Sequence, residues 1–134
     1  MKKYFLFNRS KEVVLASEVE LADTSWTRLK GLLGLKAEEF PSGKGLWIVP
    51  SQGVHTLGMK FPIDVVYLDG ERRVIHVCHE LPPFRIAAVK LKARSVVELP
   101  AGTLAKTCTA VGDMLEISEV EAEGGETCAA NTQS

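Results

Sequence analysis

The chain has few cysteines and no excess of charge of either sign. Its three cysteines, Cys78, Cys108 and Cys128, are far apart and form no Cys-x-x-Cys pair, so we predict reduced thiols, with neither a disulfide framework nor a zinc site. With 16 basic and 17 acidic side chains the net charge is −1, which gives no overall field to attract nucleic acid or an anionic membrane. A partner of that kind would need a local patch, and no nucleic-acid partner is expected.

Long apolar runs are also missing. The N-terminal run Tyr4-Phe5-Leu6-Phe7 stops at Asn8, which is too short for the apolar part of a signal peptide. No segment approaches the roughly 18 uninterrupted apolar residues that a membrane-spanning helix requires. We therefore expect a cytoplasmic protein without membrane insertion.

What is present is enough apolar sequence for one core. Of the 134 residues, 46% are hydrophobic and 25% are charged, as in soluble globular proteins. Residues 1–120 are expected to form a single compact domain. Residues 121–134 contain no large apolar side chain, which predicts a disordered C-terminal tail.

Apolar patterns and turn residues predict the secondary structure. The helix signal is clearest after Asp23-Thr24-Ser25, which offers several N-caps, and Trp26, Leu29, Leu32 and Leu33 then recur at helical spacing until Gly34. A short helix is expected from Thr103 to about Cys108. The predicted strands are residues 3–7, 13–21, 45–49, 63–68, 72–81, 95–99 and 114–120. The fold class predicted is α+β: a mainly antiparallel curled sheet or small β-barrel with one clear and one short helix.

Polar side chains concentrate just before the strand at residues 63–68. His55, Thr56, Met59 and Lys60 lie in a loop punctuated by glycine, and loops of this kind often hold ligands. Asp64 shares a strand face with Val66 and Leu68 and should point inward, so it needs a partner. Arg28, Lys60 and His55 are candidates. The alternative is that Asp64 accepts backbone N–H groups from the turn at residues 58–61.

Other chemistry has less support. His55 and Met59 are too few ligands for a soft metal ion, and His76, Cys78 and His79 cannot all face it from one strand. No nucleotide, phosphate, calcium or nucleophile-elbow motif occurs, so no metal and no cofactor are predicted.

Two charged features receive structural interpretations. Glu98 shares a strand face with Val96 and Arg94, and a cross-strand charge pair explains it as well as a catalytic role would. Arg85, Lys90, Lys92 and Arg94 are interpreted as a solvated strand face with too few aromatic neighbours for base stacking.

Taken in order, several short motifs resemble the family known as domain of unknown function 192, or uncharacterised protein family 0127, over roughly Leu21 to Ile117. The resemblance implies a compact domain of mixed strands and short helices and brings no established activity, substrate or cofactor. Many members read Phe-Trp-Met-Lys-Asn-Thr where this chain reads Leu57-Gly58-Met59-Lys60-Phe61-Pro62, so an aromatic has become Gly58. The motifs are Ala22-Asp23-Thr24 with Arg28 and Gly31-Leu32-Leu33-Gly34; Gly45-Leu46; Val54-His55-Thr56 with Gly58-Met59-Lys60; residues 62–69; residues 97–102; and Gly112-Asp113.

Three functional hypotheses follow. The first is a non-enzymatic binding or accessory domain whose ligand, a small molecule or a protein, contacts a surface formed by Arg28, His55, Thr56, Met59, Lys60 and Asp64. The second is a small hydrolase or transferase with Asp64 or His55 as general base. The third is that the motifs specify the fold alone, with glycines and prolines setting backbone geometry. The oligomeric state stays open.

Overall fold

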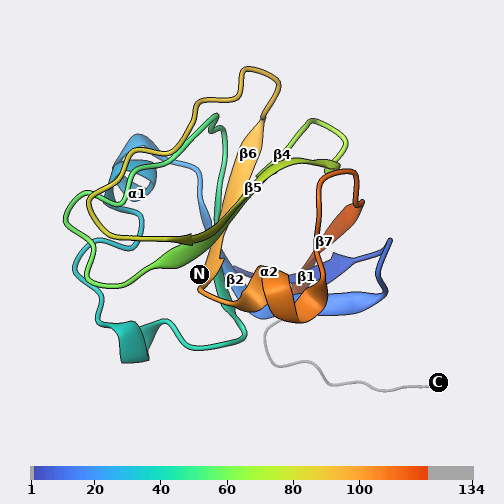
Figure 1. Cartoon of the computed structure of the whole chain (residues 1–134), viewed down its shortest axis with the longest axis horizontal. Coiled ribbons are helices and arrows are strands. Elements are labelled where there is room, and N and C mark those ends of the chain that lie inside the picture. The colour runs from blue at the N-terminus through green and yellow to red at the C-terminus, as the bar shows by residue number, and fades with distance from the viewer. Residues whose placement is uncertain (1, 121–134) are drawn as a thin grey trace.

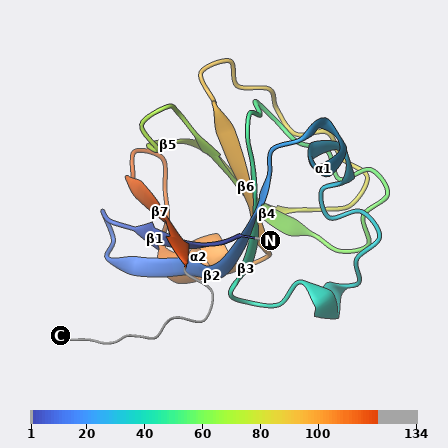
Figure 2. The ribbon, with the colours of Figure 1, turned by 180° about the vertical axis from the view of Figure 1, so that it is seen from behind.

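The computed structural model describes residues 2–120, which fold into seven strands and two short α-helices (Figures 1 and 2). The predicted tail lies outside the described residues. No helix in the described part has the length and apolar character to cross a bilayer. The elements are β1 (Lys3–Asn8), β2 (Val13–Ala22), α1 (Ser25–Lys30), the 3₁₀ turn η1 (Ala37–Glu39), β3 (Lys44–Ile48), β4 (Ile63–Leu68), β5 (Val74–Leu81), β6 (Ser95–Pro100), α2 (Thr103–Thr107) and β7 (Leu115–Val120).

The strands form one mixed sheet in the order β5-β4-β6-β3-β2-β1-β7. Every strand pair is antiparallel except β2 with β3. Residues 23–43, which hold α1 and η1, return the chain from the end of β2 to its beginning, so that β3 starts beside Glu18 and runs parallel to β2. A parallel pair needs a crossover of this kind. The prediction of a curled sheet or barrel is therefore wrong: the sheet is open, with β5 and β7 at its ends.

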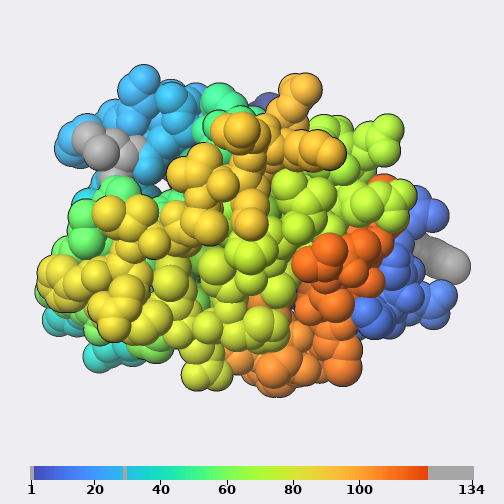
Figure 3. Space-filling view, turned by 45° about the horizontal axis from the view of Figure 1, so that its top comes forward, coloured from blue at the N-terminus to red at the C-terminus, as the bar shows by residue number. Residues whose placement is uncertain are grey.

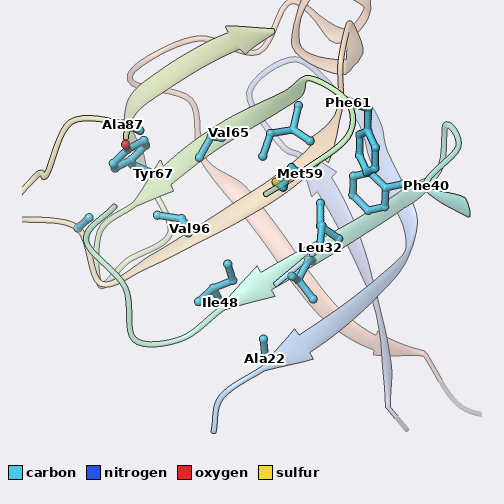
Figure 4. Packing of buried hydrophobic residues seen from close by; sticks show 13 residues of the cluster. Ala22, Leu32, Phe40, Ile48, Met59, Phe61, Val65, Tyr67, Ala87 and Val96 are labelled. Atoms are coloured by element: carbon cyan, nitrogen blue, oxygen red, sulfur yellow. The ribbon is translucent and has the colours of Figure 1, made fainter. Parts of the chain in front are cut away.

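The centre of the sheet is buried on both faces. All six residues of β4 are buried, and in β6 only Pro100 is partly exposed. Period-two alternation sends Val65, Tyr67 and Val96 into one apolar cluster and Val66, Val97 and Leu99 into another. Figure 4 shows the first cluster, in which Leu32, Ile48 and Met59 lie on the same side of the sheet.

Helix α1 is shorter than the sequence pattern predicts. Thr24 is its N-cap and accepts a hydrogen bond from the Thr27 amide, as one of the expected caps. The helix ends at Gly31, whose φ of +49° stops it one turn before Gly34. Trp26 is 69% exposed, so its expected place on the buried face is wrong. The physical reason is that six residues make less than two turns, and Leu32 reaches the core from beyond the helix.

The basic segment at residues 84–94 is not a strand. Its backbone is irregular, apart from an isolated bridge between His55 and Ile86. The predicted strand face of Lys90, Lys92 and Arg94 is therefore wrong.

Candidate functional site

A cavity of about 120 Å³ lies between α1, the loop at residues 50–59 and strand β6. Apolar and polar side chains share its wall, and Met59 and Leu32 belong to the core cluster drawn in Figure 4. The apolar walls are Leu32, Leu33, Ile48, Val54 and Met59, and the charged and polar side chains are Arg28, Lys30, Ser51, His55 and Glu98.

Glu98 is the buried acid of this cavity. It is 3% exposed, and its Oε1 has no hydrogen-bond partner. Its neighbours across the sheet are Leu46 on β3 and Val65 on β4. The predicted cross-strand charge pair is therefore wrong, because both facing residues are apolar.

Burial changes the protonation of this carboxyl. Desolvation disfavours the charged form and raises the pKa of Glu98 to about 8, from an ordinary value of 4.5. At neutral pH the group therefore keeps its proton. A neutral carboxylic acid offers one O–H donor, which a carboxylate does not.

The turn after α1 passes close to Glu98 without a side chain. A Cβ placed on Gly31 would lie 3.9 Å from Glu98 Oε1. Gly31 and Glu98 both line the cavity, so the end of the helix and the acid form one wall.

Two cationic side chains from α1 also line the cavity. Arg28 is half-buried, and its Nη1 donates to the backbone oxygen of Asp23 at 3.2 Å. Lys30 is exposed. The ion pairs found in residues 2–120 involve other side chains, so both cations keep their charge available to a ligand.

His55 and Met59 complete the predicted residues that meet at the cavity. His55 is half-buried, and its Nδ1 accepts the Leu57 amide at 3.3 Å. Met59 is 4% exposed and supplies apolar surface. The structure thus brings together Arg28, His55 and Met59.

Thr56 and Lys60 lie outside the cavity lining. The Thr56 hydroxyl donates to the Pro82 carbonyl at 2.6 Å and accepts the Arg85 amide at 2.9 Å, so it fastens two loops together. Lys60 is an exposed turn residue.

Asp64 lies on the opposite face of the sheet from Glu98. It is fully buried, and its Oδ1 and Oδ2 accept the amides of Glu80 and Leu104, each at 2.8 Å. Its pairing partner on β6 is Leu99, which belongs to the second apolar cluster. The expected charged partners of Asp64 are wrong. The alternative of backbone donors is right in kind, but the donors come from β5 and α2 instead of the preceding turn.

The sequence-based selection of site residues left out Glu98. The signal available was an acid inside the apolar run Val96-Val97-Glu98-Leu99, which predicts a strand covered on both faces. In such a strand an acid has to be buried whichever way it points.

The comparisons with known proteins now identify the family. The UPF0127 proteins of Pyrococcus abyssi and Pyrococcus horikoshii are 32% and 31% identical, each over 83% of this chain and 95% and 96% of their own lengths. That of Thermococcus sibiricus is 29% identical over 88% of this chain and 77% of its own.

Two crystal structures share the fold. A protein of unknown function from Novosphingobium aromaticivorans has a TM-score of 0.72 at 22% identity, covering 85% of this chain and 83% of that one. A Sinorhizobium meliloti protein has a TM-score of 0.71 at 21% identity, covering 86% and 92%. The family model "DUF192: Uncharacterized ACR, COG1430" matches residues 6–117. This chain therefore belongs to the DUF192 family of uncharacterised proteins.

Proposed function

We propose that this protein binds a small organic anion, a short-chain carboxylate, in the cavity lined by Glu98 and Arg28. The observation that carries the proposal is the unpartnered Oε1 of Glu98, a buried polar atom beside open space. Buried polar atoms are nearly always hydrogen-bonded, so this one lacks a partner that a ligand would supply.

The charges favour an anion over a cation. At neutral pH Glu98 holds its proton because of burial, whereas Arg28 and Lys30 are positive. A ligand carboxylate would accept the Glu98 O–H and lie near the Arg28 guanidinium, and hydrogen bonds to an ionised group are the stronger kind.

The walls limit the rest of the ligand. Leu32, Ile48, Val54 and Met59 present apolar surface, which suits an aliphatic chain. A cavity of about 120 Å³ has room for few non-hydrogen atoms. Butyrate is therefore a suitable probe.

The test is an amide-resolved NMR titration at mildly acidic pH with butyrate, butylamine and butanol. We expect butyrate to shift the amides of Gly31, His55 and Glu98, and the amine and the alcohol to shift them much less. Glu98→Gln, which keeps a donor, should retain binding, and Glu98→Leu, which removes it, should abolish binding. Glu116→Gln, at an exposed position of β7, is the matched control.

The following outcomes would count against the proposal. Preferential binding of butylamine would mean that Glu98 meets a cation as a carboxylate, which overturns the ligand class. Shifts outside the cavity, or equal binding by Glu98→Leu, would overturn the site.

A second candidate is acid-catalysed hydrolysis of an ester, which would release such a carboxylate as product. A carboxyl with a raised pKa beside an imidazole is a common acid–base arrangement, and Glu98 and His55 line one cavity. In this version Glu98 replaces Asp64, whose two oxygens already accept backbone amides. Turnover of a short-chain ester that is lost in Glu98→Gln, with butyrate binding kept, would favour catalysis over binding alone.

A further inference from the structure

The segment at residues 84–94 exposes large apolar side chains beside basic ones. Phe84, Ile86, Val89 and Leu91 are 64%, 76%, 64% and 79% exposed. Figure 3 shows this yellow segment spread over the surface of the molecule. Isolated exposed apolar residues are ordinary, but four within eight residues form a patch that calls for a partner.

Hydrogen bonds hold the backbone of this segment, Ala87 and Ala93 are buried, and the four large apolar side chains face outward. The amides of Ala87 and Lys90 donate to the carbonyls of Val54 and Gln52, each at 2.9 Å. The Tyr67 hydroxyl donates to the Ala88 carbonyl at 2.7 Å. The apolar side chains are therefore presented by a fixed scaffold.

The charges of the same segment have one sign. Arg85, Lys90, Lys92 and Arg94 lie in it, and no acid occurs between Glu80 and Glu98. The ion pairs of residues 2–120 involve other side chains. In a chain with a net charge of −1, this is a local positive patch.

We propose that the 84–94 segment docks on an anionic lipid surface, with Phe84, Ile86, Val89 and Leu91 entering the interface and the basic side chains contacting lipid head groups. Apolar side chains mixed with Lys and Arg are the composition that such surfaces select. A nucleic acid fits less well, because three of the four apolar side chains are aliphatic and cannot stack on bases. The contact is interfacial and involves no spanning segment.

The experiment is sedimentation of the full chain with lipid vesicles. Phosphatidylcholine vesicles containing about 30 mol % phosphatidylserine should bind the protein, pure phosphatidylcholine vesicles should bind it weakly, and added salt should reduce binding. The double variant Ile86→Ser/Leu91→Ser should lower the partition coefficient at least about tenfold. Val111→Ser, an equally simple change at a 59% exposed valine, is the control.

A second pair of variants tests the charges. Lys92→Ala/Arg94→Ala should lower the partition coefficient by about fivefold for each side chain removed. Lys106→Ala on α2 is the exposed control and should change it little. All these positions are exposed, so thermal melting should confirm an intact fold.

Three results would overturn the proposal. One is absence of binding to the anionic vesicles. Another is binding that the apolar and basic variants leave unchanged. The third is self-association of the free chain that Ile86→Ser/Leu91→Ser abolishes without any vesicle binding, because the patch would then meet a second copy.

Discussion

Two buried acids on neighbouring strands differ in what surrounds them. Asp64 on β4 accepts two backbone amides, from Glu80 and Leu104, so each of its oxygens has a hydrogen-bond donor. Glu98 on β6 has an Oε1 without a partner and lines a cavity. A buried acid whose oxygens accept backbone amides holds the fold together. A buried acid with an oxygen that lacks a hydrogen-bond partner and lines a cavity is the better candidate for binding.

The largest effect on stability is expected from replacing Asp64, whose two oxygens are hydrogen-bonded. Asp64→Ala leaves the buried Leu104 amide and the part-buried Glu80 amide without acceptors, and each unmet donor costs roughly 1–3 kcal/mol, so the free energy of unfolding should fall by roughly 2–6 kcal/mol. Asp64→Asn keeps one acceptor and should cost about half as much. Urea unfolding measures both.

Glu116→Ala is the control for this change, because Glu116 is exposed on β7 and should shift stability by less than about 0.5 kcal/mol. A fall as small as that of the control would mean that Asp64 does not tie β5 and α2 to β4.

Glu98, which lacks a hydrogen-bond partner at Oε1, should make the stability of the protein depend on pH. The folded pKa of Glu98, about 8, lies above the ordinary 4.5, so the native state holds a proton that the unfolded chain has released between these values. The stability due to this group is full below about 4.5 and is lost as pH rises through about 8. The loss should be about 1.4 kcal/mol per pH unit within that window.

Glu98→Gln removes the titration and isolates this contribution. The wild type should lose roughly 3 kcal/mol relative to Glu98→Gln between pH 5 and pH 7, measured by urea unfolding at each pH. The other polar side chains that line the cavity, among them Arg28, Lys30 and His55, are the same in both proteins, so the comparison isolates Glu98. A difference that does not vary with pH would show that water or a neighbouring charge already compensates Glu98.

A smaller loss is expected at the turn beside Glu98. Gly31 has φ +49° and ψ −126°, a backbone conformation that residues with a Cβ adopt only under strain. Gly31→Ala should therefore lower the free energy of unfolding by roughly 1–3 kcal/mol. The new methyl group would stand 3.9 Å from Glu98 Oε1 and should also weaken butyrate binding.

Gly34→Ala provides the matched comparison. Gly34 also has a positive φ, +86°, but a Cβ there would meet no atom within 4 Å. It should therefore lower stability in thermal melts without changing the butyrate titration. Equal loss of binding in both variants would mean that the backbone, and not the space beside Glu98, controls the cavity.

The sequence predicts local features of this fold better than long-range ones. The strand positions at β1, β2, β3, β4 and β6 and the Thr24 cap are confirmed, because each depends on residues a few positions apart. The parallel β2–β3 pair depends on how residues 23–43 cross over, which no short pattern encodes.

The candidate site shows the same limit. Clustering in sequence pointed to Asp64, Thr56 and Lys60, which are near His55 along the chain but lie outside the cavity. Glu98 is far from His55 in sequence, and only the packing of β6 behind the loop brings the two to one cavity. Which of two inward acids lacks a partner depends on donors from distant elements, here Glu80 and Leu104.

The smallest effect on stability is expected at the rim of the cavity. Arg28 is half-buried and donates to one exposed carbonyl, so Arg28→Ala should change the free energy of unfolding by less than about 0.5 kcal/mol. The same change removes a cation from the cavity wall and should weaken butyrate binding about tenfold in the NMR titration. Lys60→Ala, which removes an exposed cation outside the cavity, should leave the affinity unchanged. Equal weakening by both variants would indicate attraction by general surface charge, and Glu98 would then be no more functional than Asp64.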